Sequence, residues 1–329
     1  MRSGTSFFSL AELGAAAQLV RRAVLPTPQH AWPRLREIVG CEVWVKHENH
    51  TPIGAFKVRG GIVYMDALLR SGVKVDGVIT ATRGNHGQST AFSACRAGIP
   101  ATIYVPYGNT ADQNAAMAAF GATVVEFGRD FDEARAEAAR VADERKLHFI
   151  PPFHRNLVKG VATYALELFQ AVAELDTVYV PIGMGSGICG LIAVRDLLNL
   201  KTEIVGVIAR NAPAMALSFD AGRPVPTESA RTFADGVATR QPQEEALAVI
   251  LNGAARIVQL SEDEIAEAIR VLFHTTHQVS EGAGAASLAA LIQERDRMSG
   301  RKVGIVVTGG NIDAAVYRSI LAGETPTVG

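Results

Sequence analysis

The chain has 329 residues, enough for about two domains of ordinary size. Apolar residues make up 48% of it and charged residues 20%, and its formal net charge is −1. This composition is typical of a globular protein with a large core, and it excludes the strong positive charge with which proteins bind nucleic acids or anionic membrane surfaces.

The N-terminal segment predicts a helix rather than a targeting signal. Ser9 and Glu12 form a capping box that opens a helix ending near residues 21–22, and Glu12 interrupts the apolar run that a signal peptide needs. The longest uncharged stretch, 177–194, contains a proline and four glycines, so we expect no membrane span. Widely spaced cysteines without a CxxC pattern fit a reducing compartment, and we expect a cytoplasmic protein. The cysteines are Cys41, Cys95 and Cys189.

From residue 77 onward the pattern alternates strands and helices. The expected strands are 77–82, 101–106 and 123–127, and the expected helices are 85–97, 110–119 and 131–145. Short apolar strands between helices indicate a parallel sheet that is covered on both faces.

A second series follows residues 151–152. The expected helices are 157–173, one from about 187, one behind the capping box 261–264, and 284–298; the expected strands are 177–182, 203–209 and 302–308. Residues 210–256 predict no clear elements. We therefore expect an α/β protein with two parallel-sheet domains and a ligand cleft at the carboxyl ends of the strands.

Four segments place reactive or anion-binding groups beside a turn or a helix start. Lys57, between an aromatic residue and Gly60, is a candidate aldehyde-binding amine, although most lysines are simply solvated. Thr82 follows a strand and can cap the next helix, whose free N–H groups would then face an anion.

The other two segments are rich in glycine. Residues 183–190 allow the backbone to wrap a phosphate at a helix N-terminus. They also contain a GxGxxG, so a nicotinamide site is the alternative, but the following strand ends at Arg210 rather than at an acid that could hold a ribose. Thr308 ends a strand before two glycines, where a plain helix cap is the alternative.

Taken together and in order, these segments resemble fold type II pyridoxal-phosphate enzymes of the serine/threonine dehydratase and serine racemase group. The resemblance extends from about Thr27 to Asp313. Its motifs are FKVRGG, RGNHGQ, VPIGMGSGICG, FADGVA, EGAGAASLAAL and TGGNID. It implies the tryptophan synthase beta-like fold, with two three-layer domains: a large cofactor-binding domain of residues 1–50 and 151–329, and a small domain of 51–150 that closes over the substrate.

The resemblance also implies the roles of individual residues toward pyridoxal 5′-phosphate. Lys57 would form the Schiff base, Phe56 would pack against the pyridine ring, and Asn85 would hydrogen-bond the 3-hydroxyl. Thr308 would meet the ring nitrogen, and Gly236 and Glu281 would line the cleft. The phosphate would be held by Gly183, Met184, Gly185, Ser186 and Gly187. The substrate would be bound by Thr82, Arg83, Gly84, Asn85 and His86.

These roles imply an ammonia-lyase that removes water from a small 3-hydroxy amino acid such as threonine or serine, giving a 2-oxo acid and ammonia. Lys57 would take the α-proton. A hydroxyl at the ring nitrogen, unlike a carboxylate, would not keep that nitrogen protonated, which favours β-elimination over transamination. Homodimers are common in the group, so we expect one.

Departures from the group's pattern narrow the function. Related racemases carry an acid/base serine where this chain has Arg83, which is a poor proton shuttle, so racemisation is disfavoured. Arg83 either closes the domains through a salt bridge or, with His154, Arg155 or Lys159, recognises a bulky or anionic substrate such as hydroxyaspartate or phenylserine.

Some relatives bind an activating cation through an acidic pair, but residues 209–216 contain no carboxylate. We therefore expect no metal there, and we interpret His274 and His277 as ordinary helix residues. The chain ends soon after TGGNID, so we expect no C-terminal regulatory domain. The alternative functions are a racemase, an NAD(P)-dependent dehydrogenase using residues 185–190, and a non-catalytic amino-acid sensor.

Overall fold

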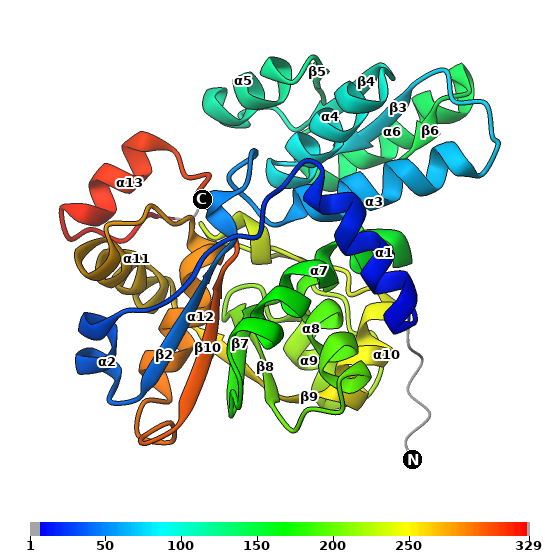
Figure 1. Ribbon diagram of the computed structural model, residues 1–329. Coiled ribbons are helices and arrows are strands. Elements are labelled where there is room, and N and C mark those ends of the chain that lie inside the picture. The colour runs from blue at the N-terminus through cyan, green and yellow to red at the C-terminus, as the bar shows by residue number, and fades with distance from the viewer. Residues whose placement is uncertain (1–6, 328–329) are drawn as a thin grey trace.

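The computed structural model, which describes residues 7–327, contains two β-sheets (Figure 1). The larger sheet has the strand order β1-β2-β10-β7-β8-β9. All neighbouring pairs in it are parallel except β1 with β2. Its strands are β1 (Gln29–Ala31), β2 (Glu42–His47), β7 (Thr177–Pro181), β8 (Glu203–Ala209), β9 (Ala254–Leu260) and β10 (Lys302–Val307).

The smaller sheet is wholly parallel, with the strand order β5-β4-β3-β6. Its strands are β3 (Val78–Ala81), β4 (Ala101–Val105), β5 (Thr123–Glu126) and β6 (His148–Phe149). The chain therefore leaves the large sheet after β2 and returns to it with β7. The expected α/β class with parallel sheets is confirmed; the exact domain boundaries remain a prediction.

Helices cover both faces of the large sheet. One apolar cluster joins the sheet to α7 (Arg155–Ala171), α8 (Ser186–Leu197), α9 (Ala214–Ala221) and α10 (Glu244–Gly253). A second cluster joins it to α2 (Pro33–Val39), α11 (Glu262–Thr276), α12 (Gly282–Gln293) and α13 (Ala314–Leu321). Apolar residues fill both interfaces, so the core lies on the two sides of β10, β7 and β8.

The small sheet is covered in the same way. On one face lie α3 (Lys57–Arg70), α4 (Asn85–Ala97) and α5 (Ala111–Ala119), and on the other lies α6 (Phe131–Arg145). α1 (Leu10–Arg21) packs against α7 and α3 and so links the two halves (Figure 1). Two short 3₁₀ helices complete the described chain, η1 (Glu48–His50) and η2 (Asp235–Val237).

Local signals set most element ends. Ser9 and Ser261 each accept a hydrogen bond from the N–H three residues later, so both predicted capping boxes are confirmed. Helix α12, expected to reach residue 298, ends at Gln293, and Glu294 turns to bond Arg256. The segment 210–256, which gave no clear sequence signal, contains α9, η2, α10 and the start of β9.

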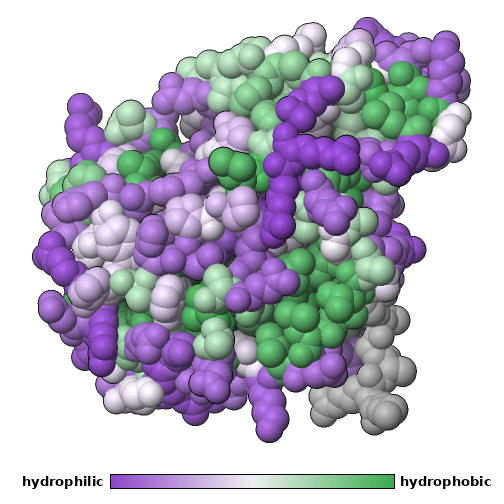
Figure 2. Space-filling model, in the orientation of Figure 1, coloured by the Kyte–Doolittle hydropathy of each residue, from purple (hydrophilic) through white to green (hydrophobic). Residues whose placement is uncertain are grey.

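Apolar and polar residues are interspersed over the face of the molecule in Figure 2, with a broad hydrophobic area on its lower half. Leu217 of α9 is among the exposed large apolar residues. Among the described residues, no helix has both the length and the apolar character needed to span a membrane.

Candidate active site

A cavity of 370 Å³ lies between the two sheets, at the carboxyl ends of their strands. A small cavity adjoins it and shares several lining residues. Together the two cavities are lined by every residue to which the family resemblance assigned a role toward the cofactor or the substrate. These are Phe56, Lys57, Thr82, Arg83, Gly84, Asn85, His86, Gly183, Met184, Gly185, Ser186, Gly187, Gly236, Glu281 and Thr308.

Lys57 is the first residue of α3, and its ammonium lies 4.9 Å from the centre of the Phe56 ring. Burial lowers the pKa of Lys57, although the Glu281 carboxylate acts in the opposite direction. The N–H of Phe56 donates to the carbonyl of Thr308 (3.0 Å), which fixes the start of α3 against the end of β10. The site thus holds a buried amine with an increased fraction of the neutral, nucleophilic form.

The glycine loop joins β7 to α8 and lies close to the opposite wall. Gly185 has φ = 101°, a conformation that side chains rarely adopt. A Cβ on Gly183 would lie 2.2 Å from the carbonyl oxygen of Gly236, so no side chain fits there. The N–H groups in the first turn of α8 have no partners within the helix and form a natural anion site.

This donor set fits pyridoxal phosphate. An amine, a phosphate-sized glycine turn at a helix N-terminus and a hydroxyl on Thr308 line one small cavity. A Cβ on Gly187 would be in ordinary van der Waals contact with Tyr164 Oη (3.4 Å), Val180 Cγ2 (3.5 Å) and the Phe56 ring (3.9 Å), so Gly187 lies directly beside these groups.

Asn85 lies between two polar partners at the other side of the cavity. Its Nδ2 donates to both oxygens of Glu281 (2.9 and 3.0 Å), and its Oδ1 accepts from Asn311 Nδ2 at 2.7 Å. Burial raises the pKa of Glu281 to about 7, although the Asn85 hydrogen bond and the Lys57 charge oppose the shift. Glu281 is therefore part protonated near neutral pH.

The N-terminus of α4 forms another side of the cavity. Thr82 Oγ1 accepts from the N–H of Gly84 (3.0 Å), and the N–H groups in the first turn of α4 point to the cavity side of the helix. Burial lowers the pKa of His86 to about 4, so its imidazole is neutral, and its buried Nε2 has no hydrogen-bond partner. This arrangement can hold a carboxylate without a charged side chain.

Charged pairs cross the cleft beside the cavity. Arg83 approaches Asp235 at 3.9 Å, and Arg240 reaches Asp130 (3.7 Å) and pairs with Asp132 on α6. These contacts connect the small-sheet half with the segment that precedes α10.

Three basic residues suggested as companions of Arg83 lie elsewhere, so that expectation is wrong. His154 caps α7, Arg155 donates to the carbonyl of Phe7, and Lys159 approaches Glu12 at 3.9 Å. None of the three is among the described residues that line the 370 Å³ cavity.

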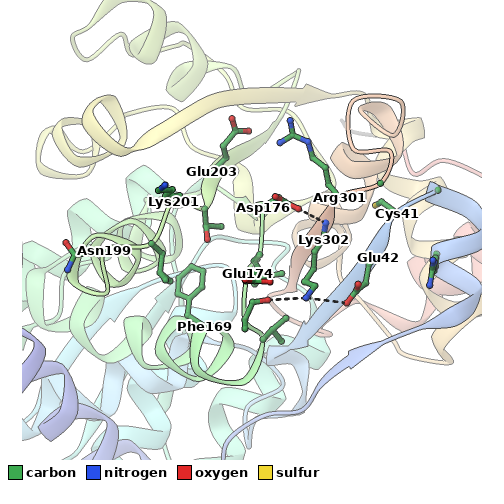
Figure 3. Close-up of a pocket in the computed structure, with 18 residues that line it drawn as sticks. Cys41, Glu42, Phe169, Glu174, Asp176, Asn199, Lys201, Glu203, Arg301 and Lys302 are labelled. Atoms are coloured by element: carbon green, nitrogen blue, oxygen red, sulfur yellow. Dashed lines mark hydrogen bonds and ion pairs between the residues drawn. The ribbon is translucent and has the colours of Figure 1, made fainter.

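A larger pocket of 1110 Å³ lies at the opposite, amino-terminal ends of β2, β7, β8 and β10 (Figure 3). Its Asp176 carboxylate accepts from the N–H of Lys302 (2.8 Å), while the ammonium of Lys302 bonds the carbonyl of Ala173 and approaches Glu42 (Figure 3). Ligands of parallel α/β sheets bind at the carboxyl ends of the strands. We therefore assign the chemistry to the cavity beside Lys57.

The polar residues of the cavity that sequence reasoning did not identify include Gln113, Asp235 and Asn311. Asp235 and Asn311 stand inside motifs that it quoted, FADGVA and TGGNID, but neither shows its contacts in the local sequence. Gln113 lies on α5, and its contacts with Gln88 and Asn311 arise only in the folded chain.

Comparisons with known proteins agree with this geometry. The profile of the family described as pyridoxal-phosphate dependent enzyme matches residues 20–309. An L-threonine ammonia-lyase of Geobacter sulfurreducens is 37% identical over 296 residues, covering 89% of this chain and 72% of that protein. An L-threo-3-hydroxyaspartate ammonia-lyase of Saccharomyces cerevisiae is 29% identical over 95% of this chain and 97% of its own. The structure of maize serine racemase has a TM-score of 0.88 at 26% identity, covering 96% of this chain and 97% of the racemase.

Proposed function

The chain belongs to the family of pyridoxal-phosphate dependent enzymes, and from that premise we propose that it is an ammonia-lyase that removes water from a small 3-hydroxy amino acid. The observation that carries the proposal is the meeting of Lys57, the glycine loop 183–187 and the Thr308 hydroxyl around one cavity. The relatives named as ammonia-lyases support the reaction type.

Five features of the chain would hold the cofactor. Lys57 would join its aldehyde carbon, and Phe56 would pack beside the ring. The loop 183–187, with the dipole of α8, would bind the phosphate. Thr308 would face the ring nitrogen, and Asn85, held by Glu281, would face the 3-oxygen.

When bound, pyridoxal phosphate supplies an electron-withdrawing ring that makes the α-proton of an attached amino acid acidic. The chain's own residues then bind and move protons. The N–H groups at the start of α4, with Thr82, orient the substrate carboxylate. Lys57, whose pKa is lowered by burial, takes the α-proton as a neutral amine. The uncharged Thr308 places no negative charge at the ring nitrogen, which favours rapid loss of the β-hydroxyl.

We propose that Arg83 closes the cleft rather than serving as an acid or base. A guanidinium is a poor acid or base, and that of Arg83 lies 3.9 Å from Asp235 across the cleft. A racemase needs a second proton-transferring group on the face opposite Lys57, and an arginine at this position is unsuited to that role. Elimination is therefore favoured over racemisation, although a racemase is among the similar structures.

The test is 2-oxo acid release by the purified holoenzyme with threonine, serine, phenylserine and hydroxyaspartate, with racemisation of serine measured in parallel. The proposal predicts 2-oxo acid from at least one of the four and no change of serine configuration. Racemisation without release of 2-oxo acid would refute it.

We also propose a cytoplasmic homodimer. A broad hydrophobic area is visible on the lower half of the molecule in Figure 2, and an exposed area of this kind can be covered by a second copy. Light scattering of the holoenzyme should give twice the 34.9 kDa mass of one chain, and a monomer mass would refute the dimer.

A further inference from the structure

We propose that Asn311 is a positioning residue that decides which end of the Asn85 amide faces the cofactor. The loop after β10 places Asn311 Nδ2 at 2.8 Å from the carbonyl oxygen of Ile53 and at 2.7 Å from Asn85 Oδ1. The inference rests on the proposed function, in which Asn85 faces the 3-oxygen of pyridoxal phosphate.

The hydrogen-bonding rules of the three groups fix both amides. A main-chain carbonyl such as that of Ile53 can only accept, so the atom of Asn311 beside it must be the NH₂ group. The second hydrogen of that group points to Asn85, whose facing atom must therefore be its acceptor, Oδ1. The NH₂ group of Asn85 is consequently directed to Glu281 and the cavity.

Glu281 alone would not fix this orientation. As an anion it accepts from the Asn85 NH₂ group, but its pKa of about 7 leaves it part protonated near neutral pH. A protonated carboxyl can donate to an amide oxygen, so it tolerates either orientation of Asn85. The carbonyl of Ile53 can never donate, so it fixes the orientation of the Asn311 amide. The Asn311 amide in turn fixes the orientation of the Asn85 amide.

One further hydrogen bond and one close approach of the backbone constrain Asn311. Gln113 Nε2 donates to its main-chain oxygen at 3.1 Å. A Cβ on Gly54, which has φ = 66°, would lie 2.8 Å from Asn311 Oδ1, so a glycine there leaves the amide its space.

The orientation of Asn85 controls the protonation of the cofactor's 3-oxygen. One hydrogen of its NH₂ group is shared between the oxygens of Glu281, and the other remains for a ligand. A donated hydrogen bond stabilises an ionised 3-oxygen, whereas a flipped amide would accept and stabilise the 3-hydroxyl.

Asn311→Asp tests this, because the carboxylate has nearly the same shape but cannot donate to Asn85. In the holoenzyme the ratio of the longer-wavelength absorption band, from the ionised 3-oxygen, to the shorter-wavelength band of the hydroxyl form should fall about tenfold, the effect of one hydrogen bond to a charged group. Asn252→Asp is the matched control: it makes the same substitution on α10, where the side chain of Asn252 donates to the carbonyl of Ala248 and lines neither cavity, and it should leave the ratio unchanged. Titration of the apoprotein with pyridoxal phosphate and its melting temperature report binding and folding separately.

In an Asn85→Ala background, Asn311→Asp should change the ratio no further, because Asn311 acts through Asn85. An unchanged ratio in Asn311→Asp with normal melting, or an equal change in the Asn85→Ala background, would overturn the inference. Should the aspartate variant not fold, Asn311→Ala replaces it, and a wild-type ratio in that variant overturns the inference equally. Absence of cofactor binding by the wild-type protein would instead refute the proposed function.

Discussion

The buried ion cluster behind Lys57 gives a stability prediction that can be worked out from its contacts. Arg59, two residues after Lys57, is fully buried; it donates to Glu48 at 2.7 and 3.0 Å and to Glu167 at 2.8 and 2.9 Å. Lys46 is also fully buried and bonds Glu167 at 2.7 Å. The cluster therefore contains two carboxylates, Glu48 and Glu167, and two cations, Arg59 and Lys46, and each carboxylate is paired with a cation.

Arg59→Met leaves two buried carboxylates with one cation. Removing one partner from such a cluster costs about 3–5 kcal/mol, because it leaves an uncompensated buried charge. Lys46 does not make up the difference, since burial lowers its pKa. We expect the free energy of unfolding of the apoprotein to fall by that amount, measured by urea unfolding with far-ultraviolet circular dichroism.

The same helix provides the control. Arg70 pairs with Asp66 at 2.8 Å, but its side chain is 76% exposed. Such a pair contributes about 0–1 kcal/mol, so Arg70→Met should have little effect. If Arg59→Met lowers the free energy of unfolding no more than Arg70→Met does, the ion pairs of the buried cluster do not stabilise the fold as proposed.

Three further predictions concern the site. Burial raises the pKa of Glu281 to about 7 from 4.5, so protonated Glu281 contributes stability that is fully present below pH 4.5 and is lost as the pH rises through 7. Between these pH values the melting temperature of the Glu281→Gln apoprotein should therefore fall less than that of the wild type. Parallel melting curves of the two proteins would contradict the raised pKa. Arg83→Ala should lower kcat/KM for threonine, phenylserine and hydroxyaspartate by a similar factor, because it opens the cleft; a changed ranking would instead show that Arg83 contacts the substrate's side chain. Gly183→Ala places a Cβ 2.2 Å from the carbonyl oxygen of Gly236 and should weaken pyridoxal-phosphate binding by the apoprotein at least about tenfold, the effect of 1.4 kcal/mol. The control, Gly14→Ala, has open space around the new Cβ and should bind the cofactor normally. Equal affinities of the two variants would contradict the role of the loop in binding the phosphate.

The sequence predicted best the elements whose ends carry local signals. The helices 85–97 and 131–145 agree with α4 and α6 in both bounds, because a turn or a capping aspartate opens each and an αL residue closes it. Strand β2 escaped notice because its end, Lys46 and His47, is polar and is followed directly by Glu48. The side chains of Lys46 and Glu48 are buried because Glu167 of α7 and Arg59 of α3 pair with them, and these partners are remote in the sequence.

The site residues also divide into those with a local sequence signal and those without one. Motifs located Lys57, the glycine loop and Thr308, since each is a local pattern that faces the ligand. The roles of Asn311 and Asp235 depend on partners 226 and 152 positions away in the chain, Asn85 and Arg83, and local spacing does not encode such pairs.

The most direct test of the whole account is to reduce the holoenzyme with borohydride and map its peptides. We predict a pyridoxyl-phosphate adduct on Lys57, together with loss of the visible absorption band, and no adduct in Lys57→Ala. A colourless protein that gains no band with added pyridoxal phosphate, or an adduct on another lysine, would contradict it.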